Sequence, residues 1–241
     1  MNLAEMTWQQ AQEAFVRTNL AIIPTGAIEV YGPHLPLGSD GIVAQDLASK
    51  LADRVGAVVT PLIPIGDSRS LLSFPGTLTV SPASFLAYLK DLSASLIHWG
   101  IKRILFINGH ATSVAIVSDL GLELAADGVR IAQVDYWRAI AMMAPEILDT
   151  GTLANRHAGE IGASVLLAVR PDLVDMNKAA RVIPRPTLAS DHPEVILSDI
   201  PFSQVTDLGM TGDATTATSQ KGEIMLGRLL DKLERFVAEW Q

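Results

Sequence analysis

The sequence predicts an α/β fold in which helices pack on a mainly parallel central sheet. Four short aliphatic or β-branched runs indicate its strands: Leu20–Pro24, Ala57–Pro61, Ile104–Ile107 and Val129–Val134. Turn residues and then a segment of helical period follow each run, and this alternation is typical of parallel sheets. The 241 residues show no internal repeat and no evident linker, so we expect one α/β sandwich domain over residues 1–241.

Three segments have the apolar spacing of amphipathic helices. The first follows Asp40, with Ile42, Val43, Leu47, Leu51 and Val55 on one side. The second follows Ser81 and Pro82, a favourable N-cap and first helical residue. Its apolar residues are Phe85, Leu86, Leu89, Leu92 and Leu96. The last carries apolar residues at Ile224, Leu226, Leu229, Leu230, Leu233, Phe236 and Val237. We expect all three to pack on the sheet or close the fold.

The segment from Met176 to about Gly212 has no sustained periodicity. Several prolines interrupt it, among them Pro184, Pro186, Pro193 and Pro201. Prolines remove backbone donors and favour turns, so we expect a long ordered loop or lid here.

Composition excludes several classes of function. The net charge of −8 and the lack of a basic run argue against a nucleic-acid partner, because phosphates require clustered Lys and Arg. The chain has no cysteine, so disulfides, cysteine metal sites and cysteine nucleophiles are excluded. The longest uncharged stretch, Leu71 to Leu89, contains Pro75 and Pro82 and makes a poor membrane helix. The N-terminal residues have no signal pattern, and we expect a cytoplasmic protein with a small-molecule substrate.

Polar residues concentrate after the predicted strands, where open α/β sheets bind ligands. The stretch from Thr25 to Asp40 follows the first strand, and Asn108-Gly109-His110 follows the third. A further stretch, Asn155 to Glu160, precedes a later helix. Two carboxylates and one or two imidazoles brought together at one sheet edge would suit Zn²⁺, Mn²⁺ or Fe²⁺. Such a cation lowers the pKa of water and polarises a carbonyl.

Structural roles are the alternatives for each of these residues. Asp40 stands just before a predicted helix, where aspartate is a common N-cap. His110 would then be a turn residue that opens a helix, and Glu29 a solvated loop acid. His34, between two prolines, is expected to be structural, and His98 and His192 to be structural or solvated. For Trp137 the default role is core packing.

Four separated blocks, in the right order, resemble the creatininase (creatinine amidohydrolase) family. They are Ile23 to Asp40, Ser68 with Phe74-Pro75-Gly76-Thr77, Asn108-Gly109-His110, and His157-Ala158-Gly159-Glu160. Thr211-Gly212-Asp213, with Ala217 and Lys221-Gly222-Glu223, resembles the C-terminal block of the family. The resemblance implies an α/β sandwich with a parallel sheet, assembly as a homohexamer and metal-dependent amidohydrolase activity.

The resemblance also implies roles for individual residues. Glu29, Asp40 and His110 match the ligands of the first metal of the family, with the aspartate bridging to a second metal. His157 matches an active-site histidine, a proton donor to the leaving nitrogen or an anchor for the substrate. Glu160 falls where many members have an acid.

The chain departs from the family pattern around the second metal. Tyr31 stands where the family usually has a histidine ligand, and Thr112 where creatininase has a glutamate. Gly162 replaces an expected acid, and Leu71 an expected histidine. Each metal site needs about three protein ligands, so we expect one tight divalent ion, with Zn²⁺ first and Mn²⁺ or Fe²⁺ as alternatives. Tyr31 could donate to an oxyanion, bind metal as phenolate, or simply pack.

These residues lead to one main hypothesis and two alternatives. The first is a metal-dependent hydrolase of an amide or cyclic amide C–N bond in a small molecule other than creatinine. Water would be the nucleophile, Glu160 or Asp40 would accept its proton, His157 would protonate the leaving nitrogen, and Tyr31 would stabilise the oxyanion. The second is a metal-dependent lactone-opening or rearranging enzyme of specialised metabolism. The third is a non-catalytic binding or scaffold homologue whose second metal site has decayed.

Overall fold

A four-stranded parallel sheet forms the centre of the molecule and confirms the predicted α/β class. The computed structural model describes residues 1–125, 128–192, 194, 197 and 200–240. The strand order is β2-β1-β3-β4. The strands are β1 (Leu20–Thr25), β2 (Val58–Val59), β3 (Arg103–Asn108) and β4 (Arg130–Asp135). Thr25 is level with Asn108, and Asn108 with Asp135, so three strands end at one edge.

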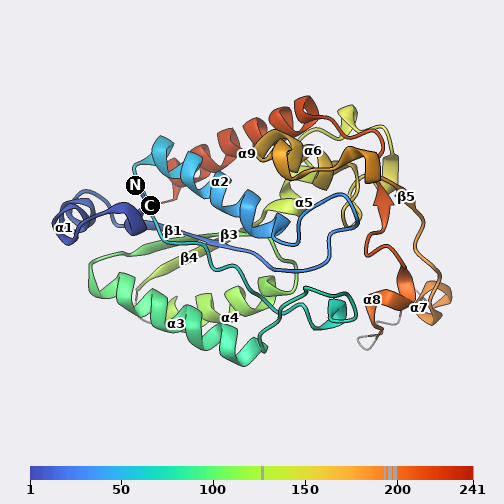
Figure 1. Ribbon diagram of the computed structural model, residues 1–241. Helices are drawn as coiled ribbons and strands as arrows, with labels where there is room; N and C mark the ends of the chain where they lie inside the picture. The colour runs from blue at the N-terminus through green and yellow to red at the C-terminus, as the bar shows by residue number, and fades with distance from the viewer. Residues whose placement is uncertain (126–127, 193, 195–196, 198–199, 241) are drawn as a thin grey trace.

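Helices cover both faces of this sheet (Figure 1). One face carries α2 (Ser39–Val55), α5 (Tyr136–Ala141), α6 (Glu160–Val169) and α9 (Ser219–Glu239). The opposite face carries α3 (Pro82–His98) and α4 (Ser113–Ala125), and α1 (Trp8–Arg17) adds Ala14 to the same core. Side chains alternate along β1: Ile22 packs in the first core and Ile23 in the second. The strands are therefore buried on both sides, as parallel sheets require.

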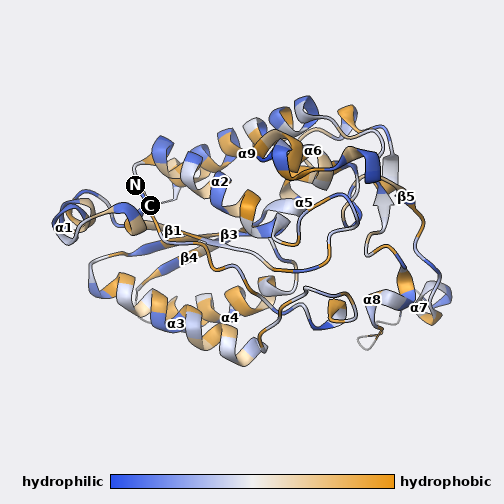
Figure 2. Cartoon of the chain, viewed as in Figure 1, coloured by the Kyte–Doolittle hydropathy of each residue, from blue (hydrophilic) through white to orange (hydrophobic). Residues whose placement is uncertain are grey.

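The three predicted helices are present, and side-chain caps begin two of them, α3 and α9. Ser81 caps α3 by accepting a hydrogen bond from the Ser84 amide, with Pro82 at the first helical position, as expected. Thr218 caps α9 in the same way, and Figure 2 shows the mixture of apolar and hydrophilic residues along this helix. The N-cap prediction for Asp40 is wrong: α2 begins at Ser39, and the Asp40 side chain has other partners. None of the described helices is long and apolar enough to cross a membrane.

Strand β2 is shorter than the predicted run Ala57–Pro61 because Pro61 has no backbone donor to continue the ladder. The chain after β2 nevertheless remains aligned with β1. The amide of Thr60 donates to the carbonyl of Ile22, and that of Ile63 to the carbonyl of Pro24. The chain beyond Pro61 therefore still runs along β1 toward the edge where the strands end.

The segment from Met176 to Gly212 contains more regular structure than the predicted loop or lid. Strands β5 (Arg181–Val182) and β6 (Gly212–Asp213) pair antiparallel. Two single-turn helices, α7 (Leu188–Asp191) and α8 (Phe202–Val205), lie between these strands. In the sequence, prolines stand within two residues of β5, of both ends of α7 and of the start of α8, and they keep these elements short: Pro184, Pro186, Pro193 and Pro201. For residues 193, 195–196 and 198–199 the prediction lies outside the described residues.

Candidate active site

The loops after β1 and β3 meet above the edge of the sheet because buried polar groups join them. The Thr25 hydroxyl donates to the Asn108 side-chain oxygen at 3.0 Å, and the backbone amide of His110 donates to the same oxygen at 3.1 Å. Gly109 is needed between them, because a Cβ atom there would lie 2.7 Å from the Tyr136 ring and 2.9 Å from the Asp40 carbonyl oxygen. This packing brings His110 to the loop that carries Glu29.

Glu29 and His110 form a buried pair, with Oε2 and Nε2 3.0 Å apart. The Ser68 hydroxyl donates to the same Glu29 oxygen at 2.6 Å. Burial alone would raise the pKa of Glu29, but the hydrogen bond and charge of His110 bring it below its ordinary value. Burial likewise opposes protonation of His110, yet the adjacent Glu29 raises its pKa. The two side chains therefore form an ion pair.

The other nitrogen of His110 faces the Thr112 hydroxyl. Thr112 Oγ1 donates to the backbone carbonyl of Asp67 at 2.8 Å, which leaves its lone pairs for His110 Nδ1, 3.1 Å away. This contact fixes the proton on Nδ1 and directs Nε2 toward Glu29. Histidine ligands of metals are commonly held by a hydrogen bond from the other ring nitrogen. Thr112 therefore orients the imidazole at a position where a glutamate was expected.

Asp40 is a second buried carboxylate beside this pair. Its Oδ1 accepts hydrogen bonds from Tyr31 Oη and from Trp137 Nε1, both at 2.8 Å. The hydroxyl of Tyr136 donates to the backbone carbonyl of Asp40 at 2.6 Å. Burial and the nearby charge of Glu29 raise the pKa of Asp40 to about 8. Without a cation Asp40 is therefore mostly protonated near neutral pH, and a bound cation would favour its carboxylate form.

The donor set fits a divalent cation, although the expected three ligands are not assembled around one point. Among the residues that the structure describes, no group of three His, Asp or Glu side chains has a metal-binding arrangement. Glu29 and His110 are in contact, whereas the Asp40 carboxylate is turned toward Tyr31 and Trp137. Within the described part of the chain, neither Asp40 Oδ2 nor Glu29 Oε1 accepts a hydrogen bond. These two oxygens and the oriented imidazole are ligands of the type that Zn²⁺ and Mn²⁺ take.

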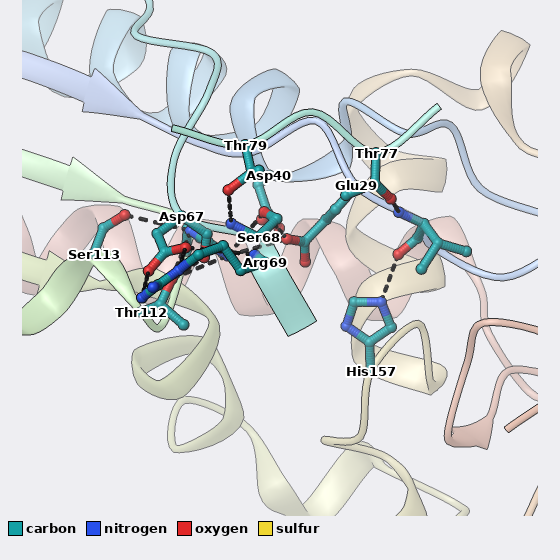
Figure 3. A network of polar contacts seen from close by, with 12 residues as sticks. Glu29, Asp40, Asp67, Ser68, Arg69, Thr77, Thr79, Thr112, Ser113 and His157 are labelled. Carbon is teal, nitrogen blue, oxygen red and sulfur yellow. Dashed lines mark hydrogen bonds and ion pairs between the residues drawn. The ribbon is translucent and has the colours of Figure 1, made fainter. Parts of the chain in front are cut away.

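In Figure 3, His157 lies at the end of the drawn group of residues that is away from Thr112 and Ser113. Its Nε2 donates to the backbone carbonyl of Val30 at 2.6 Å, and its ring centre is 4.5 Å from that of Tyr31. A carbonyl oxygen only accepts, so the neutral ring carries its proton on Nε2 and a lone pair on Nδ1. Burial lowers the pKa of His157. At neutral pH the ring therefore presents a proton acceptor, Nδ1, and can act as the expected proton donor only after that atom has taken up a proton.

A cavity of about 180 Å³ opens beside these residues. Its walls include Tyr31, Trp137, Arg156 and His157. Trp137 packs against the core, its default role, and its indole nitrogen also joins this cavity to Asp40. A larger, open cavity of about 720 Å³ lies near Asn19 and Arg103, where β1 and β3 begin, and so at the end of the sheet away from this cluster.

The structure does not bring Glu160 into this cluster, which corrects its expected role as a proton acceptor. Its carboxylate is fully buried and pairs with Lys221 Nζ. It also accepts hydrogen bonds from the backbone amides of Asp149 and Thr150 and from the Thr150 hydroxyl. These donors satisfy the carboxylate, so Glu160 anchors the turn that holds His157. Sequence analysis missed this because Lys221 lies 61 residues further along the chain.

Three other positions are placed as follows. Gly162 lies against Tyr31: a Cβ atom added to it would be 3.7 Å from the Tyr31 ring. Leu71 is buried. His34 is also buried, as its structural interpretation predicts, and neither ring nitrogen makes a well-formed hydrogen bond within the described residues. Burial lowers the pKa of His34 to about 4.

Comparison with known proteins supports these assignments of fold and family. The family model described as "Creatininase: Creatinine amidohydrolase" matches residues 4–237. A mycofactocin precursor peptide peptidase from Mycolicibacterium smegmatis is 30% identical, over 92% of this chain and 85% of its own. A creatinine amidohydrolase from Pseudomonas putida is 27% identical, over 93% and 91%. The solved structure titled "Creatininase Mn" superposes with a TM-score of 0.84 at 24% identity, over 99% and 97% of the two chains.

Proposed function

Since this chain belongs to the creatininase family, we propose that it is a metal-dependent hydrolase of an amide or cyclic amide C–N bond in a substrate other than creatinine. The observation that carries this proposal is the buried Glu29–His110 pair beside a second acidic side chain, Asp40, whose hydrogen-bond donors Tyr31 and Trp137 line the cavity. The names of the two relatives, an amidohydrolase and a peptidase, both describe hydrolysis at a C–N bond.

Glu29, Asp40 and His110 are the residues that would hold the ion. A divalent cation there would supply Lewis acidity, which polarises an amide carbonyl and makes water a stronger acid. We place one ion per chain, with Zn²⁺ first and Mn²⁺ or Fe²⁺ as alternatives, because Tyr31 and Thr112 occupy positions where the family has further ligands.

His157 is the proposed proton carrier. Its Nδ1 holds a lone pair because Nε2 is committed to the Val30 carbonyl, and its lowered pKa keeps the ring neutral near pH 7. Nδ1 would accept a proton from the attacking water and then deliver it to the leaving nitrogen. The carboxylate of Glu160 takes no part, since Lys221 and the backbone around Thr150 already satisfy it.

Tyr31 is proposed as a positioning residue. Burial raises its pKa well above the ordinary value of 10.0, so the hydroxyl stays protonated, and its proton is donated to Asp40. That proton is not available to an oxyanion while this bond persists. Tyr31 therefore fixes the orientation of the Asp40 carboxylate and forms one wall of the cavity.

Metal content per chain, measured by elemental analysis of protein purified without added metal, tests the proposal. We expect about one ion in the native chain, lost in Glu29→Gln and in His110→Ala together with amide hydrolysis. Asp46→Asn and His98→Ala are matched controls: Asp46 pairs with Lys50 on the surface, and His98 is exposed at the end of α3.

The other outcomes each decide a different point. Two ions would mean that Tyr31 or a neighbouring residue completes a second site. No bound ion at any supplied concentration would overturn the hydrolase and favour a non-catalytic binding or scaffold protein. Bound metal with turnover of lactones but not of amides would favour the lactone-opening alternative.

A further inference from the structure

One wall of the cavity is a short turn, Asn155 to Gly159, of which Asn155 to Ala158 line the cavity and whose backbone is held tightly. The Gly159 amide donates to the Arg156 carbonyl at 2.9 Å, and the Thr211 amide to the His157 carbonyl at 2.9 Å. Ala158 has φ of 58°, the only positive value at a non-glycine position in the described chain. Such a conformation costs about 1 kcal/mol or more and persists where the surroundings enforce it. The turn therefore has a fixed shape.

This turn directs a free cation to the mouth of the cavity. Asn155 and Arg156 are exposed and line the cavity together with His157. Arg156 begins from a fixed position, because its Cβ packs against Gly212: a Cβ on that glycine would be only 3.0 Å away. Its guanidinium has no hydrogen bond or ion pair with any residue that the structure describes.

Arg156 differs in this from most arginines that the structure describes. Seven of the other eleven pair with carboxylates: Arg17–Glu13, Arg54–Asp231, Arg69–Asp67, Arg170–Asp172, Arg181–Asp213, Arg185–Asp207 and Arg228–Glu146. The protein carries a net charge of −8, so carboxylates are abundant on its surface. An arginine that remains unpaired beside a cavity is available for an anionic ligand.

We propose that Arg156, with the Asn155 amide as a second donor, binds a carboxylate of the substrate, so that this enzyme acts on amides that carry a free carboxylate near the scissile bond. This inference rests on the proposed amide hydrolase. Glu29 and Asp40 would repel such a group if it lay next to them, and Arg156 provides a cationic subsite on the cavity wall that separates it from them. The planar guanidinium matches a carboxylate with two parallel hydrogen bonds.

The size of the cavity limits the part of the substrate that lies between its carboxylate and its scissile amide. Its 180 Å³ corresponds to about six water volumes at roughly 30 Å³ each. That space holds one amino-acid-sized group, with the carboxylate at Arg156 and the amide toward Asp40. Two kinds of ligand share this chemistry: a cyclic amide bearing a carboxylate, and the C-terminal residue of a peptide.

Two pairs of ligands test the subsite by binding, measured with ligand-observed NMR titrations. The first pair is 5-oxoproline and its primary amide, and the second is trialanine with a free or an amidated C-terminus. In each pair one ligand has a free carboxylate, and the other has a neutral amide in its place. We expect at least one carboxylate to bind about tenfold more tightly than its amide, and Arg156→Gln to remove this preference. Arg156→Lys should keep part of it, because an ammonium lacks the bidentate geometry.

Arg138→Gln is the matched control. Arg138 is also exposed and also has no ion pair within the described residues, and it follows Trp137 directly but does not line the cavity. It should keep the native preference, which separates direct contact from the general effect of one positive charge. Thermal unfolding of each variant checks that the fold is intact.

Each result has a definite meaning. The pair that shows the Arg156-dependent preference identifies the source of the carboxylate. Equal binding within both pairs, or a preference that survives Arg156→Gln, overturns the subsite. Because binding is measured without turnover, an Arg156-dependent preference in a protein that hydrolyses no amide would retain the subsite and reject the hydrolase. Hydrolysis of neutral amides at the same rate as their carboxylate partners would retain the hydrolase and reject the subsite.

Discussion

Tyr31 Oη donates a hydrogen bond to Asp40 Oδ1 at 2.8 Å in a site from which water is almost fully excluded. Trp137 donates to the same oxygen, so Asp40 Oδ1 is satisfied and Oδ2 is left for another partner. A tyrosine thus controls the direction of a carboxylate at a position where the family usually has an imidazole.

Replacing Tyr31 separates positioning from ligation. Among the described residues, Tyr31→Phe leaves Trp137 as the one side-chain donor to Asp40, and loss of a hydrogen bond to a buried carboxyl group costs about 1–3 kcal/mol. We expect kcat to fall roughly 10- to 100-fold while about one metal ion per chain is retained. Tyr31→His should instead raise the metal content toward two. Unchanged kcat in Tyr31→Phe would show that the tyrosine only packs, and elemental analysis with steady-state kinetics makes both measurements.

Metal removal by a chelator should abolish hydrolysis without unfolding the chain. Glu29 and His110 neutralise each other at 3.0 Å, and Ser68 adds a hydrogen bond, so the buried charges keep partners when no cation is present. Circular dichroism should stay unchanged and the melting temperature should fall by a few degrees, since a ligand at 100 times its Kd stabilises by about 2.7 kcal/mol. Unfolding on chelation would instead indicate that the metal is required for the fold.

Lys221 should be far more important for stability than an ordinary surface lysine. Lys221→Met leaves the fully buried Glu160 without its cation, and an unpaired buried charge costs about 3 kcal/mol or more. Lys50→Met, which breaks the exposed pair with Asp46, should cost below about 1 kcal/mol. Urea unfolding measures both. The double variant Lys221→Met/Glu160→Leu should recover part of the loss, and no recovery would contradict this account.

The Lys221–Glu160 pair also makes the stability of the fold depend on pH in the acid range. Lys221 and the surrounding donors lower the pKa of Glu160 despite its burial. Its contribution to stability is therefore present above the unfolded-state pKa near 4.5 and is lost as the pH falls through the lower folded-state value. Unfolding titrations between pH 5 and 3 should show a smaller loss in Lys221→Met than in the native chain, because part of the contribution is already absent.

His34 predicts a second loss of stability, at higher pH. Its folded-state pKa of about 4 lies below the ordinary 6.5, so the unfolded chain binds a proton first as the pH falls. Stability is complete above pH 6.5 and declines by about 3 kcal/mol on the way to pH 4. His34→Asn should remove this slope, whereas His98→Asn, at an exposed histidine, should not. An identical slope in all three proteins would rule out His34 as its source.

Local patterns were sufficient to predict most of the fold. The run Leu20–Pro24 became β1, and Ser81 with Pro82 starts α3, because alternation, burial on both faces and capping act within a few residues. The interrupted β2 is the exception. There Pro61 ended the ladder while the chain kept its direction along β1, a distinction that requires the neighbouring strand to be known.

The site was predicted less completely, because its chemistry depends on contacts between distant residues. Glu29 and His110 meet as expected. The sequence did not show that Asp40 would be held by Tyr31 and by Trp137, which lies 97 positions away, or that Glu160 would be engaged by Lys221. The proton on His157 was also unpredictable, since it depends on a backbone carbonyl and not on a side-chain motif.

The ion pair between Lys221 and Glu160 also has a consequence for protein synthesis. The ribosome makes Lys221 61 residues after Glu160, so the nascent chain exposes the Asn155–Gly159 turn well before the cation that anchors it has been polymerised. The sheet strands, all earlier in the sequence, can pair in the meantime. The order of translation therefore supplies the strands of the central sheet first and the cation that anchors the His157 end of the site last.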